Sequence, residues 1–204
     1  MWGGALFPLG WLLRGMLVGG LGADPVETLL HQTGTWGLIL LLVTLSVTPV
    51  RRITGWNRVV KLRRLLGLFS YFYATLHVGI YLVLDQSLAP SFILEDVIER
   101  PYVTAGAGAF LILSLLAWTS TRGWIRRLGR RWQRLHRLVY AAGALVVVHF
   151  LWQVKADARE ALVFTTIYVA LMLFRVPWSR LISGLKKTVH EDRGAPTPTP
   201  TSGR

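Results

Sequence analysis

Apolar residues in this chain gather into long runs that are separated by short charged stretches. Six runs each approach the ~20 residues that a helix needs to cross the hydrocarbon core of a bilayer. They cover residues 2–21, 34–50, 65–84, 103–119, 138–154 and 161–177. The pattern predicts an all-α fold, a polytopic membrane helix bundle with six transmembrane helices.

Composition supports this membrane location. Of the 204 residues, 52% are hydrophobic and only 16% are charged, and the mean hydropathy is +0.45. The net charge of +13 lies between the apolar runs, so membrane topology explains it and no nucleic-acid partner is expected. The absence of cysteine excludes disulfides, thiolate metal sites and cysteine nucleophiles. The first residues lack a basic segment and an A-x-A site, so we expect no removable signal peptide.

The charges between the runs alternate in sign. Residues 51–64 and 120–137 are strongly basic, whereas residues 22–33 and 85–102 are mostly acidic. Cytoplasmic loops carry the excess of lysine and arginine, so the basic loops and both termini are predicted to be cytoplasmic. Membrane lipid is therefore an expected partner of the basic loops.

The chain is expected to form one domain and a tail. Residues 1–190 contain all six apolar runs, with no visible internal repeat and no room for a soluble catalytic domain. Residues 191–204 are rich in proline and threonine, and they predict a disordered cytoplasmic tail.

The first run and the connection after it carry two further signals. Asp24 followed by Pro25 is an N-cap with proline at the first helical position, which predicts a short helix within 22–33. Arg14 interrupts the first run, and a central arginine costs about 2.5–3.5 kcal/mol on insertion scales. Two placements are open for Arg14: it snorkels to an interface, or it faces the bundle.

Two histidines lie deep within apolar runs. His77 follows Arg64 by 13 residues and His149 follows Arg137 by 12, on runs that both lead outward from the cytoplasm. At 1.5 Å per residue, both imidazoles lie ~18–20 Å from the cytoplasmic boundary. Two neutral imidazoles at one level suit the axial positions of a non-covalent b-type haem, since no CxxCH motif exists. The open alternative is that each histidine only makes an interhelical hydrogen bond.

The remaining histidines are less informative. His136 lies at the cytoplasmic mouth of the fifth run, where it is either a ligand of a second cofactor or an interfacial residue. On an ideal helix the His136 side chain points ~140° away from that of His149. Either a local irregularity at Gly143 brings the two side chains to one face of the helix, or the two histidines act on different faces. His31 is expected to make a surface hydrogen bond, and His190 is assigned no role.

The basic loops and one small-residue run each allow two interpretations. The arginines are expected mainly to face lipid headgroups, and the alternative is that some hold haem propionates, a flavin phosphate or a cytosolic electron donor. Residues 104–109 are rich in glycine and alanine, which favours close helix packing over contact with a flat cofactor.

Several short motifs together resemble one family. They are Gly-Leu-Gly-Ala-Asp-Pro at 20–25, His-Gln-Thr-Gly at 31–34, Arg-Arg-Leu-Leu-Gly-Leu at 63–68, Thr-Leu-His at 75–77, Arg-Pro-Tyr at 100–102, Leu-Gly-Arg-Arg-Trp-Gln-Arg-Leu-His at 128–136 and His-Phe-Leu-Trp-Gln-Val-Lys at 149–155. Over nearly all of residues 4–190 the chain resembles the MsrQ (YedZ-type) proteins. These are haem-binding membrane subunits of the bacterial periplasmic methionine-sulfoxide reductase system, within the wider ferric-reductase-like transmembrane group.

The resemblance implies a site and a function. It implies that His77, His136 and His149 are haem-associated, with one haem b or two, and that FMN is a further cofactor. It also implies a multi-pass protein of the bacterial inner membrane. Such a protein would pass electrons from the quinone pool or a cytosolic flavin reductase to a periplasmic molybdopterin-dependent methionine-sulfoxide reductase, for repair of oxidised periplasmic proteins.

One position departs from the wider group, which often carries a second histidine nearer the cytoplasmic end of the third span. The equivalent position here, 13 residues before His77, is Arg64. A second haem would therefore use an unusual ligand, and Arg64 is retained as a candidate cofactor-binding residue.

These observations predict an electron-transfer subunit of an oxidoreductase complex rather than a catalytic subunit, because no nucleophile or catalytic carboxylate pair is evident. One alternative is a stand-alone b-type cytochrome that reduces ferric iron or exchanges electrons with quinone. The other is a non-redox transport or assembly protein whose histidines only tie helices together.

Overall fold

The computed structural model describes residues 2–154 and 158–175, which contain helices and no strands. The α-helices are α1 (Trp2–Val18), α2 (Pro25–Thr54), α3 (Leu62–Ile80), α4 (Pro90–Glu99), α5 (Pro101–Trp118), α6 (Arg122–Leu128), α7 (Arg130–Leu135), α8 (Leu138–Gln153) and α9 (Arg159–Leu173). A 3-10 helix, η1 (Asn57–Lys61), precedes α3, and a π-helix, η2 (Tyr81–Asp85), follows it. The predicted all-α class is confirmed, while the predicted tail, 191–204, lies outside the described residues.

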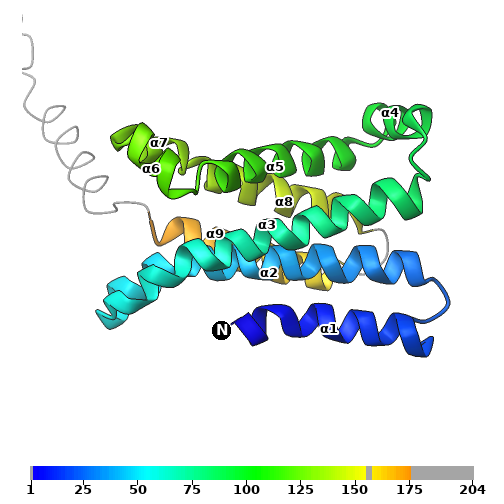
Figure 1. The fold of residues 1–204 in the computed structure, drawn as a ribbon, viewed down its shortest axis with the longest axis horizontal. Coiled ribbons are helices and arrows are strands. Elements are labelled where there is room, and N and C mark those ends of the chain that lie inside the picture. The colour runs from blue at the N-terminus through cyan, green and yellow to red at the C-terminus, as the bar shows by residue number, and fades with distance from the viewer. Residues whose placement is uncertain (1, 155–157, 176–204) are drawn as a thin grey trace, which may run out of the picture.

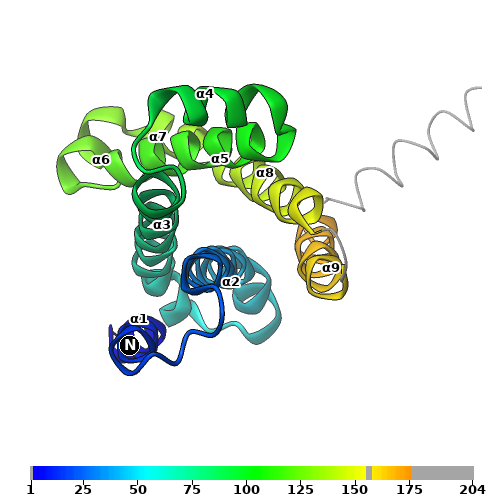
Figure 2. The same cartoon turned by 90° about the vertical axis from the view of Figure 1, so that its right-hand side faces the viewer.

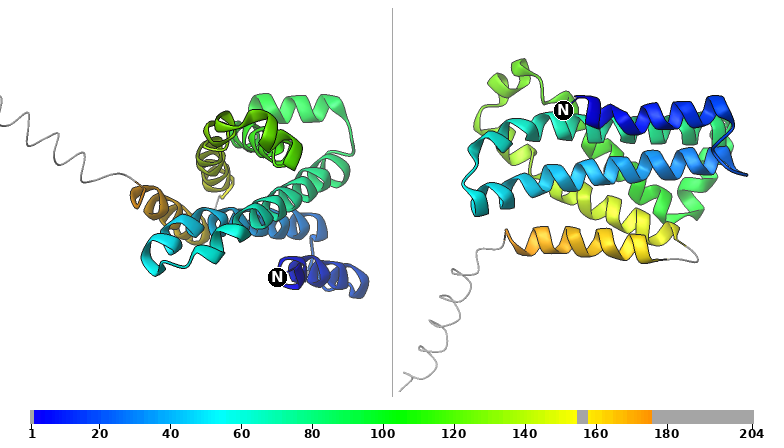
Figure 3. Two further views of the ribbon diagram at one scale, coloured as in Figure 1. Left: turned by 60° about the vertical axis from the view of Figure 1, so that its left-hand side comes forward. Right: turned by 90° about the horizontal axis from the view of Figure 1, so that it is seen from below.

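The long helices lie side by side and alternate in direction along the chain (Figure 1). Helix α2 occupies the centre, with α1 and α9 on opposite sides of it (Figures 2 and 3). Helices α3 and α8 run in the same direction, as the sequence predicts for the two spans that carry His77 and His149. The chain turns through η1, α6 and α7 at one end of the bundle, the α7 end, and through α4 at the other, the α4 end.

Four stretches are long and apolar enough to cross a membrane, and they coincide with the second to fifth predicted spans. They are Pro25–Thr54, Asn57–Asp85, Pro101–Trp118 and Arg130–Gln153. Helix α1 is apolar but has 17 residues, and α9 has 15. The fold is thus that of a membrane helical protein, while the count of six spans and the side on which the termini lie stay predictions.

Reporter fusions test the predicted topology. A reporter fused after Arg204 should be active only if it functions in the cytoplasm, because the basic loops hold the α7 end there. A second fusion within the 85–100 connection, at the α4 end, should give the opposite pattern and serves as the control. Activity of a periplasmic reporter at Arg204 would overturn the six-span topology.

Helix α2 begins where the sequence predicts but does not end there. The Asp24 carboxylate accepts a hydrogen bond from the backbone N–H of Glu27 at 2.9 Å, and Pro25 occupies the first turn. The expected short helix in 22–33 then continues without a break into the second span, as far as Gly55 in the left-handed conformation (φ 69°). The prediction of a separate short helix is wrong, because no residue between the two segments interrupts the helical backbone.

Pro49 lies inside α2 and removes one helix hydrogen bond. Proline has no N–H, so the carbonyl of Leu45, four residues earlier, has no donor in its own helix. Leu45 is fully buried, and an unpaired carbonyl there would be costly. Arg175, just after α9, donates to this carbonyl through Nη2, and its Nη1 donates to the Tyr140 hydroxyl. The guanidinium also lies over the Tyr140 ring, 4.7 Å from its centroid, so it links α2, α8 and α9.

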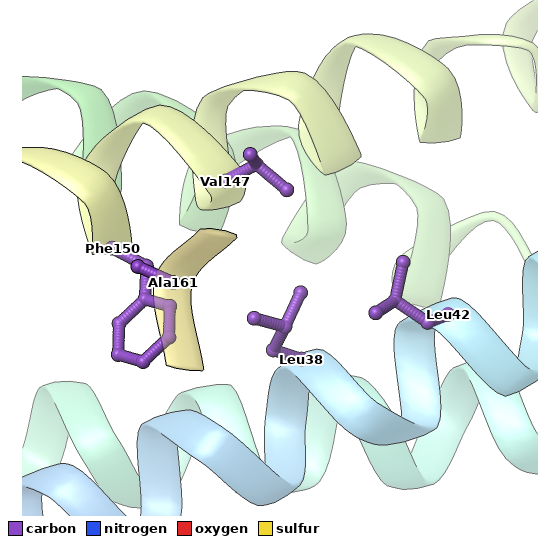
Figure 4. Packing of buried hydrophobic residues seen from close by; sticks show 5 residues of the cluster. All are labelled: Leu38, Leu42, Val147, Phe150 and Ala161. Carbon is purple, nitrogen blue, oxygen red and sulfur yellow. The ribbon is translucent and has the colours of Figure 1, made fainter. Parts of the chain in front are cut away.

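The apolar core between these helices is built from α2, α8 and α9. Leu38 and Leu42 of α2 lie opposite Val147 and Phe150 of α8, with Ala161 of α9 beside them (Figure 4). Each of these side chains has less than a tenth of its surface exposed. This contact keeps α8 in register with the central helix.

Helix α1 packs against both α2 and α3. Tyr73 is fully buried, and its hydroxyl donates to the Ala5 carbonyl at 2.7 Å. Arg14 is exposed, so of its two open placements the one facing the bundle interior is excluded. Its charge therefore has to reach an interface along the outside of α1.

The acidic connection 85–102 contains a helix that the sequence did not predict. Helix α4 lies crosswise to the spans (Figure 2), and Asp96 on it is buried. The Asp96 carboxylate accepts hydrogen bonds from the Tyr81 hydroxyl at 3.1 Å and from Gln86 Nε2 at 2.9 Å, and pairs with Arg100 Nε at 3.3 Å. These contacts hold α4 against the segment that follows α3 and against the start of α5.

Candidate functional site

The structure brings His77 and His149 together. His77 comes from α3 and His149 from α8, and their ring centroids are 6.1 Å apart with the ring planes at 84°. Both residues are half-buried within the bundle. The equal depth inferred from helical rise therefore corresponds to a direct pairing of the two imidazoles.

Each imidazole is held by a backbone carbonyl of the preceding helix in its pair. His77 Nδ1 lies 2.9 Å from the Leu30 carbonyl oxygen on α2, and His149 Nδ1 lies 2.7 Å from the Tyr102 carbonyl oxygen on α5. A carbonyl oxygen can only accept, so Nδ1 must carry the proton in both rings. In the neutral imidazoles Nε2 then keeps its lone pair, which makes it the atom available to a metal.

A glycine lies against each ring. A Cβ on Gly34 of α2 would lie 3.1 Å from His77 Nδ1, and a Cβ on Gly106 of α5 would lie 2.8 Å from His149 Nδ1. Both glycines stand four residues after the carbonyl that holds the ring. We call Leu30 with Gly34, and Tyr102 with Gly106, the two carbonyl–glycine pairs.

The two halves of the site repeat one another. Tyr102, Gly106 and His149 each follow their counterparts Leu30, Gly34 and His77 by 72 positions. The helix pair α2–α3 and the helix pair α5–α8 thus present a histidine in the same way. These are three spaced positions and not a stretch of similar sequence, so the expectation of no internal sequence repeat is not contradicted.

The pair has the separation that a shared metal requires. With metal–nitrogen bonds of about 2.0 Å and about 1.2 Å from ring centroid to nitrogen, two imidazoles facing one metal have centroids about 6.4 Å apart. The observed value is 6.1 Å. Across residues 2–154 and 158–175, no group of three histidine, aspartate or glutamate side chains could hold a metal ion. Two imidazoles alone therefore suit an iron whose other ligands come from a macrocycle.

His136 lies apart from this pair, at the α7 end. Its ring stacks on Trp132 with centroids 3.9 Å apart, and Nδ1 lies 3.2 Å from the Trp132 carbonyl. Its Nε2 lies 3.3 Å from the Ser120 hydroxyl, which is itself 2.7 Å from the Leu116 carbonyl. The hydroxyl donates its proton to the carbonyl and has lone pairs left to accept an Nε2–H, so Ser120 joins His136 to the end of α5.

The geometry between His136 and His149 also differs from the ideal-helix expectation. Helix α7 ends at Leu135, His136 caps it, and α8 begins at Leu138, so the irregularity lies at His136 itself. Gly143, the expected site of irregularity, lies within α8. There a Cβ would meet the Tyr168 ring at 2.7 Å, which makes Gly143 a packing residue between α8 and α9.

The two other candidate residues occupy opposite ends of the bundle. Arg64 is exposed near the start of α3, at the α7 end, and its role stays a prediction. His31 lies near the α4 end, where its Nε2 is 3.6 Å from a carboxylate oxygen of Glu160. His31 thus makes a surface contact between α2 and α9, as expected, and does not enter the paired site.

Sequence reasoning identified both imidazoles but not what holds them. Gly34 and Gly106 do lie in stretches that the sequence made notable, one at the end of the 31–34 motif and the other in the small-residue run 104–109. That run was interpreted as a helix-packing surface. In the structure the run does pack closely against α8, and one of its glycines, Gly106, lies against the His149 imidazole.

A family model matches more than half of the chain. Residues 33–148 match the family described as "Ferric reductase like transmembrane component". The matched region includes α3, α5 and most of α8, and ends one residue before His149. It thus contains Gly34 and His77 of the first half of the site and Tyr102 and Gly106 of the second.

Relatives cover most of the chain. A Xanthomonas axonopodis pv. citri protein is 50% identical over 79% of this chain and 73% of its own length. Proteins of Xanthomonas euvesicatoria pv. vesicatoria and Herminiimonas arsenicoxydans are both 45% identical, over 94% and 86% of this chain and 88% and 82% of their own. Each is called "Protein-methionine-sulfoxide reductase heme-binding subunit MsrQ". The chain belongs to the ferric-reductase-like transmembrane family and, within it, to the MsrQ proteins.

Proposed function

We propose that this protein is a membrane electron-transfer subunit in which His77 and His149 hold the iron of a b-type haem. The observation that supports this most is the pairing of the two imidazoles, each with Nδ1 on a backbone carbonyl. The names of the relatives describe heme-binding subunits. When bound, haem b supplies reversible one-electron chemistry.

The chain's own residues have three tasks in this proposal. The two Nε2 atoms would coordinate the iron, and the carbonyls of Leu30 and Tyr102 orient the rings that would present them. The surrounding helices keep water from the pair. A non-redox role for the histidines is less well supported, because a tie between helices does not require two imidazoles 6.1 Å apart that each bond a backbone carbonyl through Nδ1.

We propose that the electrons leave toward a protein-methionine-sulfoxide reductase, which the names of the relatives mention. We further propose, from the family resemblance, that this reductase is periplasmic and molybdopterin-dependent. The α4 end, with Asp96 and three neighbouring acids in 85–102, is the proposed periplasmic side. The arginine-rich α7 end would face the quinone pool or a cytosolic flavin reductase. The cations there, with Arg64 among them, suit haem propionates or the phosphate of FMN if a second cofactor is bound.

Reconstitution with the partner tests this function. Purified protein in nanodiscs, reduced and mixed with the soluble reductase subunit, should transfer electrons to it and support reduction of a protein-bound methionine sulfoxide. The His31→Ala variant, altered outside the pair, should behave as the unmodified protein does. Haem without transfer to this partner would favour a stand-alone cytochrome, and absence of haem would favour the non-redox alternative.

We propose that His136 serves the entry of electrons, because it lies at the arginine-rich α7 end, the side proposed to face the donor. His136→Ala should slow reduction of the protein by a quinol or flavin donor severalfold. Once reduced chemically, the variant should deliver electrons to the partner at the unmodified rate. Stopped-flow spectroscopy measures reduction by the donor and delivery to the partner separately. Normal reduction with impaired delivery would reverse the assigned direction of electron flow.

A further inference from the structure

Each histidine is bonded to a carbonyl that already belongs to a helix. In an α-helix the carbonyl of residue i accepts the N–H of residue i+4, so its remaining lone pair lies beside the side chain at i+4. Several threonines of this chain use that position, and three of them serve as examples. Their hydroxyls donate to the carbonyl four residues earlier at 2.6–2.8 Å, in the pairs Thr33–Leu29, Thr44–Leu40 and Thr165–Ala161.

At Gly34 and Gly106 no side chain fills this position. The imidazole of a neighbouring helix enters it instead and donates Nδ1–H to the carbonyl at i, which is Leu30 in one case and Tyr102 in the other. The same construction occurs twice, on two different helix pairs, at the same spacing. Two independent occurrences indicate that the missing side chain is a requirement of the contact.

We infer that Gly34 and Gly106 are positioning residues for the two haem ligands: they open the carbonyls of Leu30 and Tyr102 to the histidine rings, and so set ring orientation and the electron donation of Nε2. This inference rests on the proposed haem at His77 and His149. It concerns what tunes that haem, and it names residues that do not touch the iron.

The distances show why even the smallest side chain would disturb the contact. A Cβ at Gly106 would lie 2.8 Å from Nδ1 and 3.0 Å from Cε1 of His149, and a Cβ at Gly34 would lie 3.1 Å and 3.2 Å from the same atoms of His77. A ring held by a metal on one side and a carbonyl on the other cannot turn away without losing one of them. An added methyl group should therefore push Nδ1 off its carbonyl.

Loss of this hydrogen bond should shift the haem midpoint potential in a definite direction. A ligand that donates its second N–H to a carbonyl is more basic, and it stabilises the more positive, oxidised iron. Weakening the bond removes that stabilisation and should raise the midpoint potential. Gly106→Ala should have the larger effect and Gly34→Ala the smaller, following the two distances.

Four alanine variants test the inference. Gly106→Ala and Gly34→Ala should change the haem midpoint potential and the g-values of the oxidised haem in electron paramagnetic resonance. Gly108→Ala on α5 and Gly37→Ala on α2 are matched controls, since their Cβ atoms would meet only ordinary contacts at 3.5 Å and 3.6 Å. For Gly106→Ala we expect at least a tenfold change in the oxidised-to-reduced ratio at the original midpoint, or about 59 mV for one electron.

The results that support the inference differ from those that overturn it and from those that would contradict the haem assignment. A positive shift, or haem loss with normal helicity, confined to the Gly106 and Gly34 variants supports the inference. Unchanged potentials and g-values in both, or equal changes in the Gly108 and Gly37 controls, overturn it. Failure of the underlying haem assignment would appear elsewhere, as normal spectra in the histidine variants.

Discussion

Replacing His77 or His149 with alanine should abolish or strongly alter the low-spin haem spectrum of the purified protein. The two imidazoles are the only histidine rings within reach of one another in the described part of the chain, with centroids 6.1 Å apart. Removing either would leave the iron with one strong axial ligand, which weakens the ligand field and the retention of haem. Reduced-minus-oxidised absorption spectra and haem content per protein measure the effect, and we expect near-complete loss of the low-spin signal in each variant.

His31→Ala provides the control for this prediction. His31 lies on α2 near the α4 end, in a surface contact with Glu160, and its removal should leave the spectrum unchanged. Normal spectra in both the His77 and the His149 variants would remove these residues as ligands. A spectrum lost in only one variant would show that the iron takes its second ligand from another residue.

The second large effect is expected at Arg175, and it should depend on Pro49. Arg175→Leu removes the donor to the buried Leu45 carbonyl, which Pro49 leaves without a helix partner. An unsatisfied buried carbonyl costs about 1–3 kcal/mol, so the free energy of unfolding should fall by about that amount. Thermal or denaturant unfolding in one detergent, followed by far-UV circular dichroism, measures the change.

A double-mutant cycle identifies the cause. Pro49→Ala restores a backbone N–H to Leu45, so Arg175→Leu should cost much less in that background. Pro8→Ala in α1 changes a helix proline far from Arg175 in sequence and should leave the cost of Arg175→Leu unchanged. If Arg175→Leu destabilises equally with proline or alanine at position 49, the carbonyl is not the reason for its effect.

The sequence predicted the fold well where helices are regular and apolar. Counting 1.5 Å per residue placed His77 and His149 at one depth because α3 up to His77 and α8 up to His149 are uninterrupted helices. The same counting does not apply between His136 and His149, because α7 ends at Leu135 and α8 begins only at Leu138. The crosswise helix α4 was missed although Pro90 stands at its start, since charge dominated the interpretation of that segment.

The supporting parts of the site could not be predicted in the same way. Which carbonyl orients an imidazole depends on how α2 approaches α3 and how α5 approaches α8, and hydropathy contains no information on either distance. Glycine in an apolar helix is equally compatible with close packing, as Gly143 illustrates. The link from Arg175 to Leu45 joins residues 130 positions apart, and nothing in the local sequence of either residue indicates it.

The use of main-chain acceptors has a consequence for how the protein tolerates mutation. Leu30 and Tyr102 contribute through atoms that all amino acids possess, so most substitutions at positions 30 and 102 leave the acceptor in place. Gly34 and Gly106 contribute only by lacking a side chain, so every substitution there adds an obstacle. A saturation mutational scan should thus be permissive at 30 and 102 and restrictive at 34 and 106. The sensitive positions of this site would be ones with no functional group of their own.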